Sequence, residues 1–264
     1  MRTINELMIE YVNKGLTTNQ AESGVCQQII INKISKSKFA DNVLLKGGVV
    51  MFHLTNNTRR ATIDLDFDFI RYDISDASIR SFIKLLNRYD EQYKISVIET
   101  KELKQDDYHG KRVLVNVNDQ TRSIKFKLDI GVHTLLAIEQ TSLCFSFEGG
   151  ATFLKANPPE QMVSEKLYSL AKHNALSGRY KDVYDIYYLI ANSNLNKKIV
   201  KKCLELLTIN GLYGINSIED VCDKVSEALE DGDFLSHLDK TKDKWIDEDT
   251  SIVAKTIIDY IYSI

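Results

Sequence analysis

The chain of 264 residues has few of the residues that crosslink or interrupt a fold. Its only cysteines, Cys26, Cys144, Cys203 and Cys222, are scattered and include no C-x-x-C pair. Neither a zinc site of that spacing nor a disulfide framework is therefore expected. We predict reduced thiols, as in a cytoplasmic protein.

Long apolar runs are also lacking. No uninterrupted run approaches the ~18 residues that a membrane helix needs. The opening stretch, MRTINELMIEYVNKG, is amphipathic and has no apolar core of a signal peptide. With 44% apolar and 27% charged residues, the composition is that of a soluble globular chain and argues against disorder. We expect a cytoplasmic location and no membrane partner.

The sequence also has no large excess of basic over acidic residues, since its net charge is −3. The distribution is uneven: residues 1–60 and 161–210 each hold 8 Lys+Arg against 4 Asp+Glu, whereas residues 211–264 hold 5 against 13. Two interpretations stay open for the basic segments. They bind a polyanion locally, or they are ordinary solvated helix faces.

Only two prolines occur, and Pro158-Pro159 separates two kinds of pattern. Before them, strand-like stretches such as KISVIET, RVLVNVN and SIKFKLDIGV alternate apolar and polar residues. After them every periodic stretch is helical, and the proline pair suits a helix start. The pattern predicts an α+β protein with a mixed N-terminal module, residues 1–155, and an all-helical C-terminal module, residues 156–264.

The stretch IDLDFDF, residues 63–69, has the period of a strand. Its apolar residues share one face, and Asp64, Asp66 and Asp68 share the other. Aligned carboxylates repel one another, so a bound cation is expected to compensate. We expect Asp64 and Asp66 to hold Mg²⁺ or Mn²⁺ and Asp68 to take an exposed role beyond the metal.

A glycine pair lies just upstream, in Lys46-Gly47-Gly48, between an apolar strand and a helix start. Alone, such a glycine pair is more often a plain tight turn than a phosphate site. Followed by Asp-x-Asp on a strand, it predicts a site for a nucleoside triphosphate (NTP). We expect Lys46, the glycine N–H groups and the helix start to contact phosphate, and the carboxylates to hold the metal.

A two-metal phosphoryl-transfer site needs a third carboxylate to position and activate the attacking hydroxyl. Asp129 is the candidate, because in SIKFKLDIG it shares a strand face with Lys125 and Lys127. If that strand lies beside IDLDF, Asp129 joins the other two aspartates. Lys127 then contacts phosphate or a nucleic-acid backbone. The alternative for Asp129 is a surface carboxylate near a strand end.

At these motifs the chain resembles a known family. LLKGG, the loop with Arg59-Arg60-Ala61-Thr62, and DLDF are similar to the first motif of the AbiEii/AbiGii nucleotidyltransferase toxins, which have a polymerase-β-like nucleotidyltransferase fold. SEKLYSLAKHNALSGRYKDVYDIYYL is similar to the family's helical motif. The resemblance covers roughly residues 40–192. It implies a mixed sheet, an NTP substrate, an RNA acceptor, above all a tRNA end, and a cognate antitoxin.

In the helical motif, the resemblance implies that Lys166 contacts the triphosphate and that Asp182 orients it or contacts the base. The alternative is that Lys166 and the aspartates only pair with each other across a short turn. We expect Asp185 to be structural.

One departure from the family concerns the hydroxyl that often follows the glycines. Val49 stands there, so Thr62 is the candidate to supply a hydroxyl from the other side. Two alternatives to RNA nucleotidyl transfer stay open. One is a nucleotide- or RNA-binding protein of the same fold that is catalytically weak, and the other is a nucleotidyltransferase that acts on a small molecule or a protein.

Overall fold

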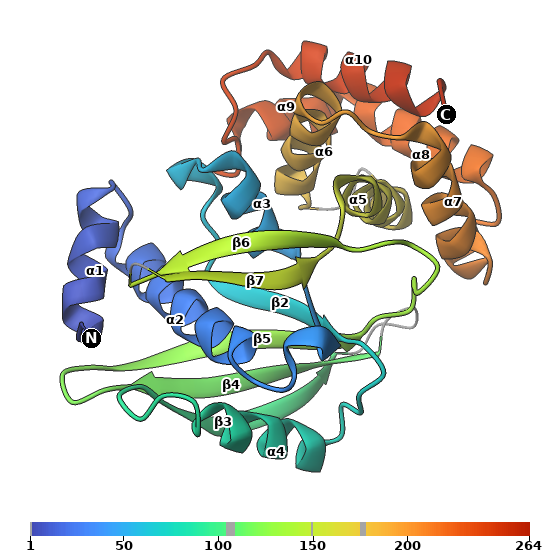
Figure 1. The fold of residues 1–264 in the computed structure, drawn as a ribbon. Helices are drawn as coiled ribbons and strands as arrows, with labels where there is room; N and C mark the ends of the chain where they lie inside the picture. Colours follow the sequence, from blue (N-terminus) through green and yellow to red (C-terminus); the bar gives the residue numbers. More distant parts are fainter. Residues whose placement is uncertain (1, 104–108, 149, 175–177) are drawn as a thin grey trace. The chain divides into compact units, whose positions relative to one another are not determined.

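The computed structural model describes residues 2–103, 109–148, 150–174 and 178–264, which form two compact units (Figure 1). Unit 1 comprises Met1–Thr134 and Gln140–Asn157, and unit 2 comprises Leu135–Glu139 and Pro158–Ile264. Unit 1 holds a mixed sheet and unit 2 is helical, so the predicted α+β class is confirmed. The assignment of domains at 1–155 and 156–264 stays a prediction.

The sheet of unit 1 has seven strands in the order β3-β4-β5-β2-β1-β7-β6. Two neighbouring pairs, β2 with β5 and β1 with β7, are parallel, and the other four pairs are antiparallel. The strand bounds are β1 Val43–Lys46, β2 Asp64–Phe69, β3 Lys94–Leu103, β4 Gly110–Asn118, β5 Ser123–Val132, β6 Thr141–Phe147 and β7 Gly150–Ala156.

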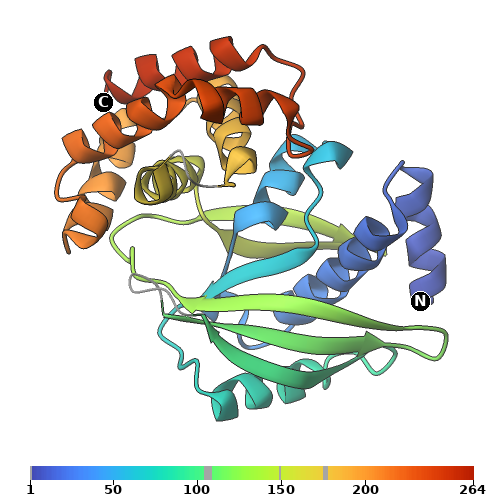
Figure 2. The same cartoon turned by 180° about the vertical axis from the view of Figure 1, so that it is seen from behind.

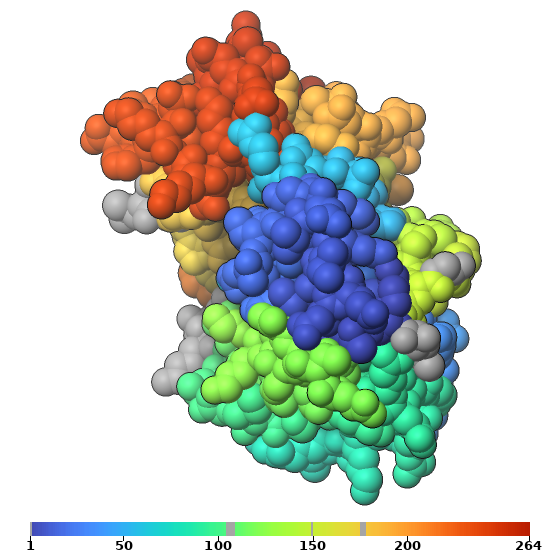
Figure 3. Space-filling view, turned by 90° about the vertical axis from the view of Figure 1, so that its left-hand side faces the viewer, coloured from blue at the N-terminus to red at the C-terminus, as the bar shows by residue number. Residues whose placement is uncertain are grey.

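The described residues of unit 1 form four α-helices, and local capping explains where three of them begin. Thr3 and Thr17 each form a capping box, and Ser75 caps through its hydroxyl. α2 packs between α1 and the sheet, and α1 lies on the outside of this unit, in dark blue in Figure 3. The bounds are α1 Ile4–Asn13, α2 Thr18–Ser35, α3 Gly47–Thr55 and α4 Asp76–Leu86, with short 3₁₀ turns at Ala40–Asn42 and Thr58–Arg60.

The strand alternation seen in the sequence decides which sheet face is covered. Leu65, Phe67 and Phe69 are fully buried, and Phe82 of α4 packs edge-on against Phe69 with ring centroids 5.0 Å apart. The aspartates of β2 therefore lie on the opposite face. Burial of these large side chains is worth about 1.5–3 kcal/mol each, which outweighs the poor strand propensity of aspartate.

The described part of unit 2 contains helices and no strand. α5 begins at Pro159, in the first helical position, where the missing N–H costs nothing. Side chains of Ser217, Asp231 and Asp249 cap the starts of later helices. The bounds are α5 Pro159–His173, α6 Tyr180–Asn192, α7 Lys197–Thr208, α8 Ile218–Glu230, α9 Gly232–Lys240 and α10 Thr250–Ile261, with a 3₁₀ turn at Leu212–Gly214. Among the described residues, no helix has both the length and the apolarity to cross a membrane.

Candidate active site

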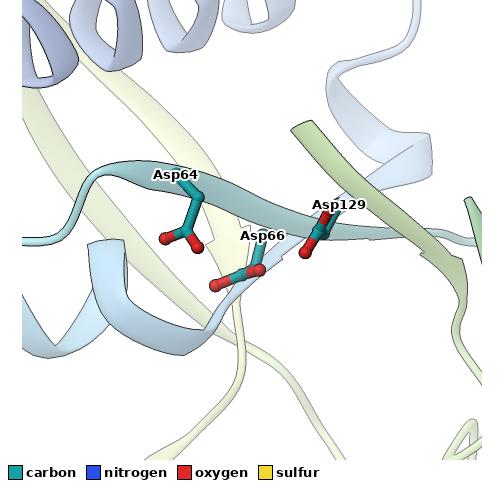
Figure 4. A group of neighbouring side chains, drawn as sticks. All are labelled: Asp64, Asp66 and Asp129. Atoms are coloured by element: carbon teal, nitrogen blue, oxygen red, sulfur yellow. The ribbon is translucent and has the colours of Figure 1, made fainter. Parts of the chain in front are cut away.

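Three aspartates converge on the face of the sheet opposite to the buried phenylalanines of β2 (Figure 4). The parallel pairing of β2 and β5 places Asp66 directly beside Asp129, and Asp64 lies two residues earlier on β2. One carboxylate oxygen from each lies within 4.8 Å of the others, and all three side chains are half-buried. The strand pairing that we expected for Asp129 is thus present, and the three oxygens could hold a metal ion.

The electrostatics of this cluster also favour a cation. Burial, together with the neighbouring charges of Asp64 and Asp129, raises the pKa of Asp66 to about 7. Lys46 and a hydrogen bond from the Gly48 N–H act in the opposite direction but do not cancel the rise. Three carboxylates at this separation therefore repel one another, and a divalent cation removes that repulsion.

The glycine turn packs directly against the carboxylates. Gly47 has a φ of 64°, and a Cβ there would collide with the Asp66 carboxylate. A Cβ at Gly48 would lie 2.6 Å from the Thr62 hydroxyl oxygen. That hydroxyl donates a hydrogen bond to Asp64, at 2.6 Å. The glycines are therefore required for close approach, whereas contact of Gly47, Gly48 and Thr62 with phosphate stays a prediction.

Lys46 and Asp68 form a pair that the sequence did not suggest. The Lys46 ammonium nitrogen lies 2.7 Å from an Asp68 oxygen. Asp68 is only 4% exposed, so the predicted exposed role for this residue is wrong. Its position on β2 opposite Leu44 of β1 puts it within reach of Lys46, because diagonal neighbours in a sheet are in range of a long side chain. Contact of Lys46 with phosphate stays a prediction.

Sequence reasoning missed Arg112. It lies on β4 opposite Asp129, and its guanidinium donates two hydrogen bonds to that carboxylate, at 2.8 and 2.7 Å. The register of the β4–β5 hairpin could have identified this pair. Asn118 pairs with Ser123 across the turn, and counting back from that pair aligns Arg112 with Asp129. Hydrogen bonding to Asp129 raises the pKa of Arg112, and the charges of Asp64 and Asp66 raise it further.

Gln27 on α2 is a second missed residue. Its side-chain amide donates to the backbone carbonyls of Thr62 and Asp64, at 3.2 and 2.7 Å. These hydrogen bonds fix the start of β2, which is at Asp64. No pattern in the sequence identifies such a contact, because it depends on how α2 packs on the sheet.

Lys127 lies on β5 opposite Asp64, with its side chain exposed. It shares the sheet face of the three aspartates, as the alternation predicted. A separate cavity of ≈ 370 Å³, lined by residues of α2, α3 and β6, includes none of the predicted site residues.

In unit 2, Lys166 of α5 binds two aspartates of α6. Its ammonium lies 2.5 Å from Asp182 and 2.8 Å from Asp185. Asp185 is fully buried and also accepts a hydrogen bond from the Trp245 indole, at 3.1 Å. Arg179 contacts Asp182 at 3.3 Å. The lysine–aspartate pairing named as an alternative is therefore present.

Desolvation acts to raise the pKa of Asp182, but the charge and hydrogen bonds of Lys166 and Arg179 outweigh it, and the pKa lies below its ordinary value. The Asp182 carboxylate is thus held ionised. This network fixes α5 to α6, and a role in binding the nucleotide stays a prediction.

A glycine turn between a strand and a helix, followed by three carboxylates on adjacent strands of a mixed sheet, is an arrangement typical of nucleotidyltransferases. The family model for "Nucleotidyl transferase AbiEii toxin, Type IV TA system" matches residues 29–245. The chain belongs to this family of nucleotidyltransferase toxins from type IV toxin–antitoxin systems, as the motifs predicted. No curated protein matches the sequence.

Two solved structures are similar in fold. JHP933 from Helicobacter pylori is 14% identical with a TM-score of 0.45, and the match covers 94% of this chain and 95% of that one. An antigenic nucleotidyltransferase-like protein from Paracoccidioides brasiliensis is 13% identical with a TM-score of 0.44, covering 75% of this chain and 93% of that one. At these identities and scores, the likenesses carry no conclusion about activity.

Proposed function

We propose that this protein transfers a nucleotide from an NTP to a hydroxyl of RNA, above all a tRNA end. The convergence of Asp64, Asp66 and Asp129 carries the proposal. Family membership supports a toxin that a cognate antitoxin neutralises.

The three carboxylates fit a divalent cation of the Mg²⁺ or Mn²⁺ type, since their oxygens lie within 4.8 Å and repel one another. Asp64, Asp66 and Asp129 would hold it. When bound in pairs, such ions neutralise the triphosphate and the departing pyrophosphate.

The acceptor hydroxyl oxygen attacks the α-phosphorus of the NTP, the bond to pyrophosphate breaks, and the hydroxyl proton passes to a base. Asp129 is that base. A carboxylate offers about four lone-pair sites, and Arg112 takes one on each oxygen. The remaining sites are available to the acceptor and to a cation. Arg112 acts as a positioning residue, because its two bonds hold the Asp129 carboxylate in one orientation.

The other predicted residues bind the NTP. The Gly47 and Gly48 backbone and the start of α3 favour an anion, and Lys46 and the Thr62 hydroxyl supply further polar contacts, whereas Lys127 contacts a backbone phosphate of the acceptor RNA. By resemblance, Lys166 contacts the triphosphate and Asp182 orients it. Their mutual ion pair fixes both side chains in unit 2.

A second candidate is a nucleotide- or RNA-binding protein without turnover. Val49 replaces the hydroxyl residue that often follows the glycines, and the Thr62 hydroxyl already donates to Asp64. This candidate predicts saturable NTP binding and no transfer.

The deciding experiment incubates the protein with each α-³²P-labelled NTP, Mg²⁺ or Mn²⁺, and total RNA. Wild type is compared with Asp66→Asn, which removes the central carboxylate charge, and with Asp259→Asn, an exposed carboxylate on α10. We expect labelled RNA with wild type and Asp259→Asn, and at least a hundredfold less with Asp66→Asn.

Three other outcomes contradict the proposal. NTP binding without any labelling supports the binding protein. Label in a small molecule or protein that persists after ribonuclease treatment supports a nucleotidyltransferase with an acceptor other than RNA. Equal labelling by Asp66→Asn excludes the three aspartates as the site.

A further inference from the structure

The sheet face that carries the three aspartates continues across β5 and β4 as a largely polar surface, in which Leu114 of β4, opposite Lys127, is apolar. On β5, Lys125 and Lys127 are exposed and point to this face, while Ile124, Phe126 and Leu128 are buried on the other. Asn116 and Arg112 of β4 lie directly opposite Lys125 and Asp129. We call these five residues, Lys125, Lys127, Asp129, Asn116 and Arg112, the β4–β5 face.

Within unit 1, helices cover the other side of these strands. α4 packs on β3 and α2 packs on β5, and Thr100 and Lys111 reach Asp76 of α4 from that side. Figure 2 shows β5, β4 and β3 from behind, and no described helix of unit 1 crosses them in that view. The β4–β5 face is therefore open within its own unit.

Its charge is uncompensated at two positions. Arg112 is paired with Asp129, and the nearby Lys101 is paired with Glu99 of the same strand, at 3.1 Å. Lys125 and Lys127 make no ion pair with any residue in the described part of the chain. Two exposed ammonium groups on an open surface attract a polyanion.

The two lysines are also aligned with the candidate active site. Lys125, Lys127 and Asp129 are alternate residues of one strand, about 7 Å apart, and Lys127 lies opposite Asp64. This step is close to the separation of successive phosphates in an extended single strand. A nucleic-acid strand whose terminal hydroxyl lies at Asp129 therefore passes Lys127 first and Lys125 next.

We propose that the β4–β5 face binds the single-stranded 3′ end of the acceptor RNA, with Lys127 and Lys125 contacting the phosphates just behind the reacting hydroxyl. This inference rests on the proposed function, because the direction of the strand follows from placing the hydroxyl at Asp129. Contacts of this kind bind the backbone phosphates, so they do not read a base sequence.

The test measures RNA binding without catalysis. A fluorescent single-stranded RNA oligonucleotide with a free 3′ hydroxyl is titrated, in EDTA and without NTP, with full-length wild type and with Lys125→Glu, Lys127→Glu and the double variant. Lys84→Glu is the matched control, since Lys84 is an exposed lysine on α4, on the covered side. Fluorescence anisotropy gives the dissociation constants at several salt concentrations.

We expect the double variant to bind at least tenfold more weakly at low salt, and Lys84→Glu to bind like wild type. Replacing both lysines by alanine should reduce the slope of log K against log salt by about 0.7 for each phosphate that a lysine no longer neutralises. Lys125→Arg and Lys127→Arg should keep the affinity, because they keep the charge.

Unchanged binding by the double variant overturns the proposal, as does an equal loss with Lys84→Glu. Equal binding of polyglutamate, with the same dependence on both lysines, overturns it in favour of an acidic polypeptide. Lysine-dependent RNA binding by a protein that labels no acceptor contradicts the proposed function alone. RNA labelling that is unaffected by both lysine substitutions contradicts only the proposal that the β4–β5 face binds the RNA.

Discussion

Asp129 shows how one residue takes its properties from a neighbour on the next strand. Its carboxylate lies beside Asp66, and its charge adds to a cluster in which the Asp66 pKa is raised to about 7. Arg112 binds both oxygens of Asp129 and places a positive charge next to the other two carboxylates. At the residue scale, Arg112 orients Asp129 and would compete with a cation bound at the three carboxylates.

This competition leads to a prediction for Arg112→Gln. Removing the guanidinium leaves the cluster more negative, so Mn²⁺ should bind several-fold more tightly. Transfer of nucleotide should fall, because the two hydrogen bonds that orient Asp129 are removed. Isothermal titration calorimetry and the labelling assay measure the two effects separately.

Arg80→Gln is the control, since Arg80 is exposed on α4. Weaker Mn²⁺ binding by Arg112→Gln would show that orientation of Asp129 matters more for the cation than charge does. Unchanged binding and unchanged labelling would remove Arg112 from the site.

At the scale of elements, the turn from β1 to α3 depends on two residues without side chains. Gly47 has a positive φ and touches Asp66, while Gly48 touches Thr62. The backbone comes this close to β2 because β1 and β2 are hydrogen-bonded neighbours, with Lys46 opposite Asp66. The turn and the carboxylates are therefore one packed unit.

Gly47→Ala is expected to lower the free energy of unfolding by at least about 1 kcal/mol, since an L-residue is strained at positive φ. It should also displace the Asp66 carboxylate and weaken Mn²⁺ binding at least tenfold. Urea denaturation and calorimetry check the two effects. Gly232→Ala, at the start of α9 with nothing within 4 Å of the added Cβ, is the control. Full Mn²⁺ affinity in Gly47→Ala would contradict the packing argument.

At the scale of the whole molecule, the two units present their charged groups differently. Unit 1 gathers three carboxylates beside Arg112, which pairs with one of them, whereas unit 2 pairs Lys166 with Asp182 and Asp185. Removing one partner of such a pair is costly because the other is left poorly solvated. The chain's single tryptophan, Trp245, is 3% exposed and contacts Asp185, so its fluorescence reports the unfolding of unit 2.

The Lys166 pair predicts a pH dependence of stability. The pKa of Asp182 is depressed in the folded state. The ionised carboxylate therefore contributes fully to the free energy of unfolding above the ordinary pKa of the carboxyl group. This contribution is lost as the pH falls through the pKa of the folded state. Asp182→Asn should cost about 1–3 kcal/mol near neutral pH. This difference from wild type should stay constant down to about pH 5, shrink as the pH falls through about 4, and go on shrinking below it.

Urea denaturation followed by Trp245 fluorescence gives the comparison, with Asp259→Asn as the control for an exposed carboxylate. A constant difference between Asp182→Asn and wild type across this pH range would show that the carboxylate charge contributes nothing.

Much of the fold and of the candidate site could be predicted from local sequence. Alternation in IDLDFDF and SIKFKLDIG identified β2 and β5 and their polar faces, because strand side chains point to opposite sides. The proline pair predicted the start of α5. Gly150–Ala156 was missed as a strand because its residues do not alternate between apolar and polar, and its pairing with both β6 and β1 makes it β7.

The sequence by itself determined which residues share a strand face, where the helical part begins, and that Asp64 and Asp66 lie together. These depend on periods of two or four residues along one chain. Only the tertiary structure decided that Asp129 lies beside Asp66, that Arg112 binds it, that Asp68 is buried against Lys46, and that Gln27 holds the start of β2. Such contacts join segments far apart in the chain, and strand order and helix packing, not local spacing, bring them within hydrogen-bond distance.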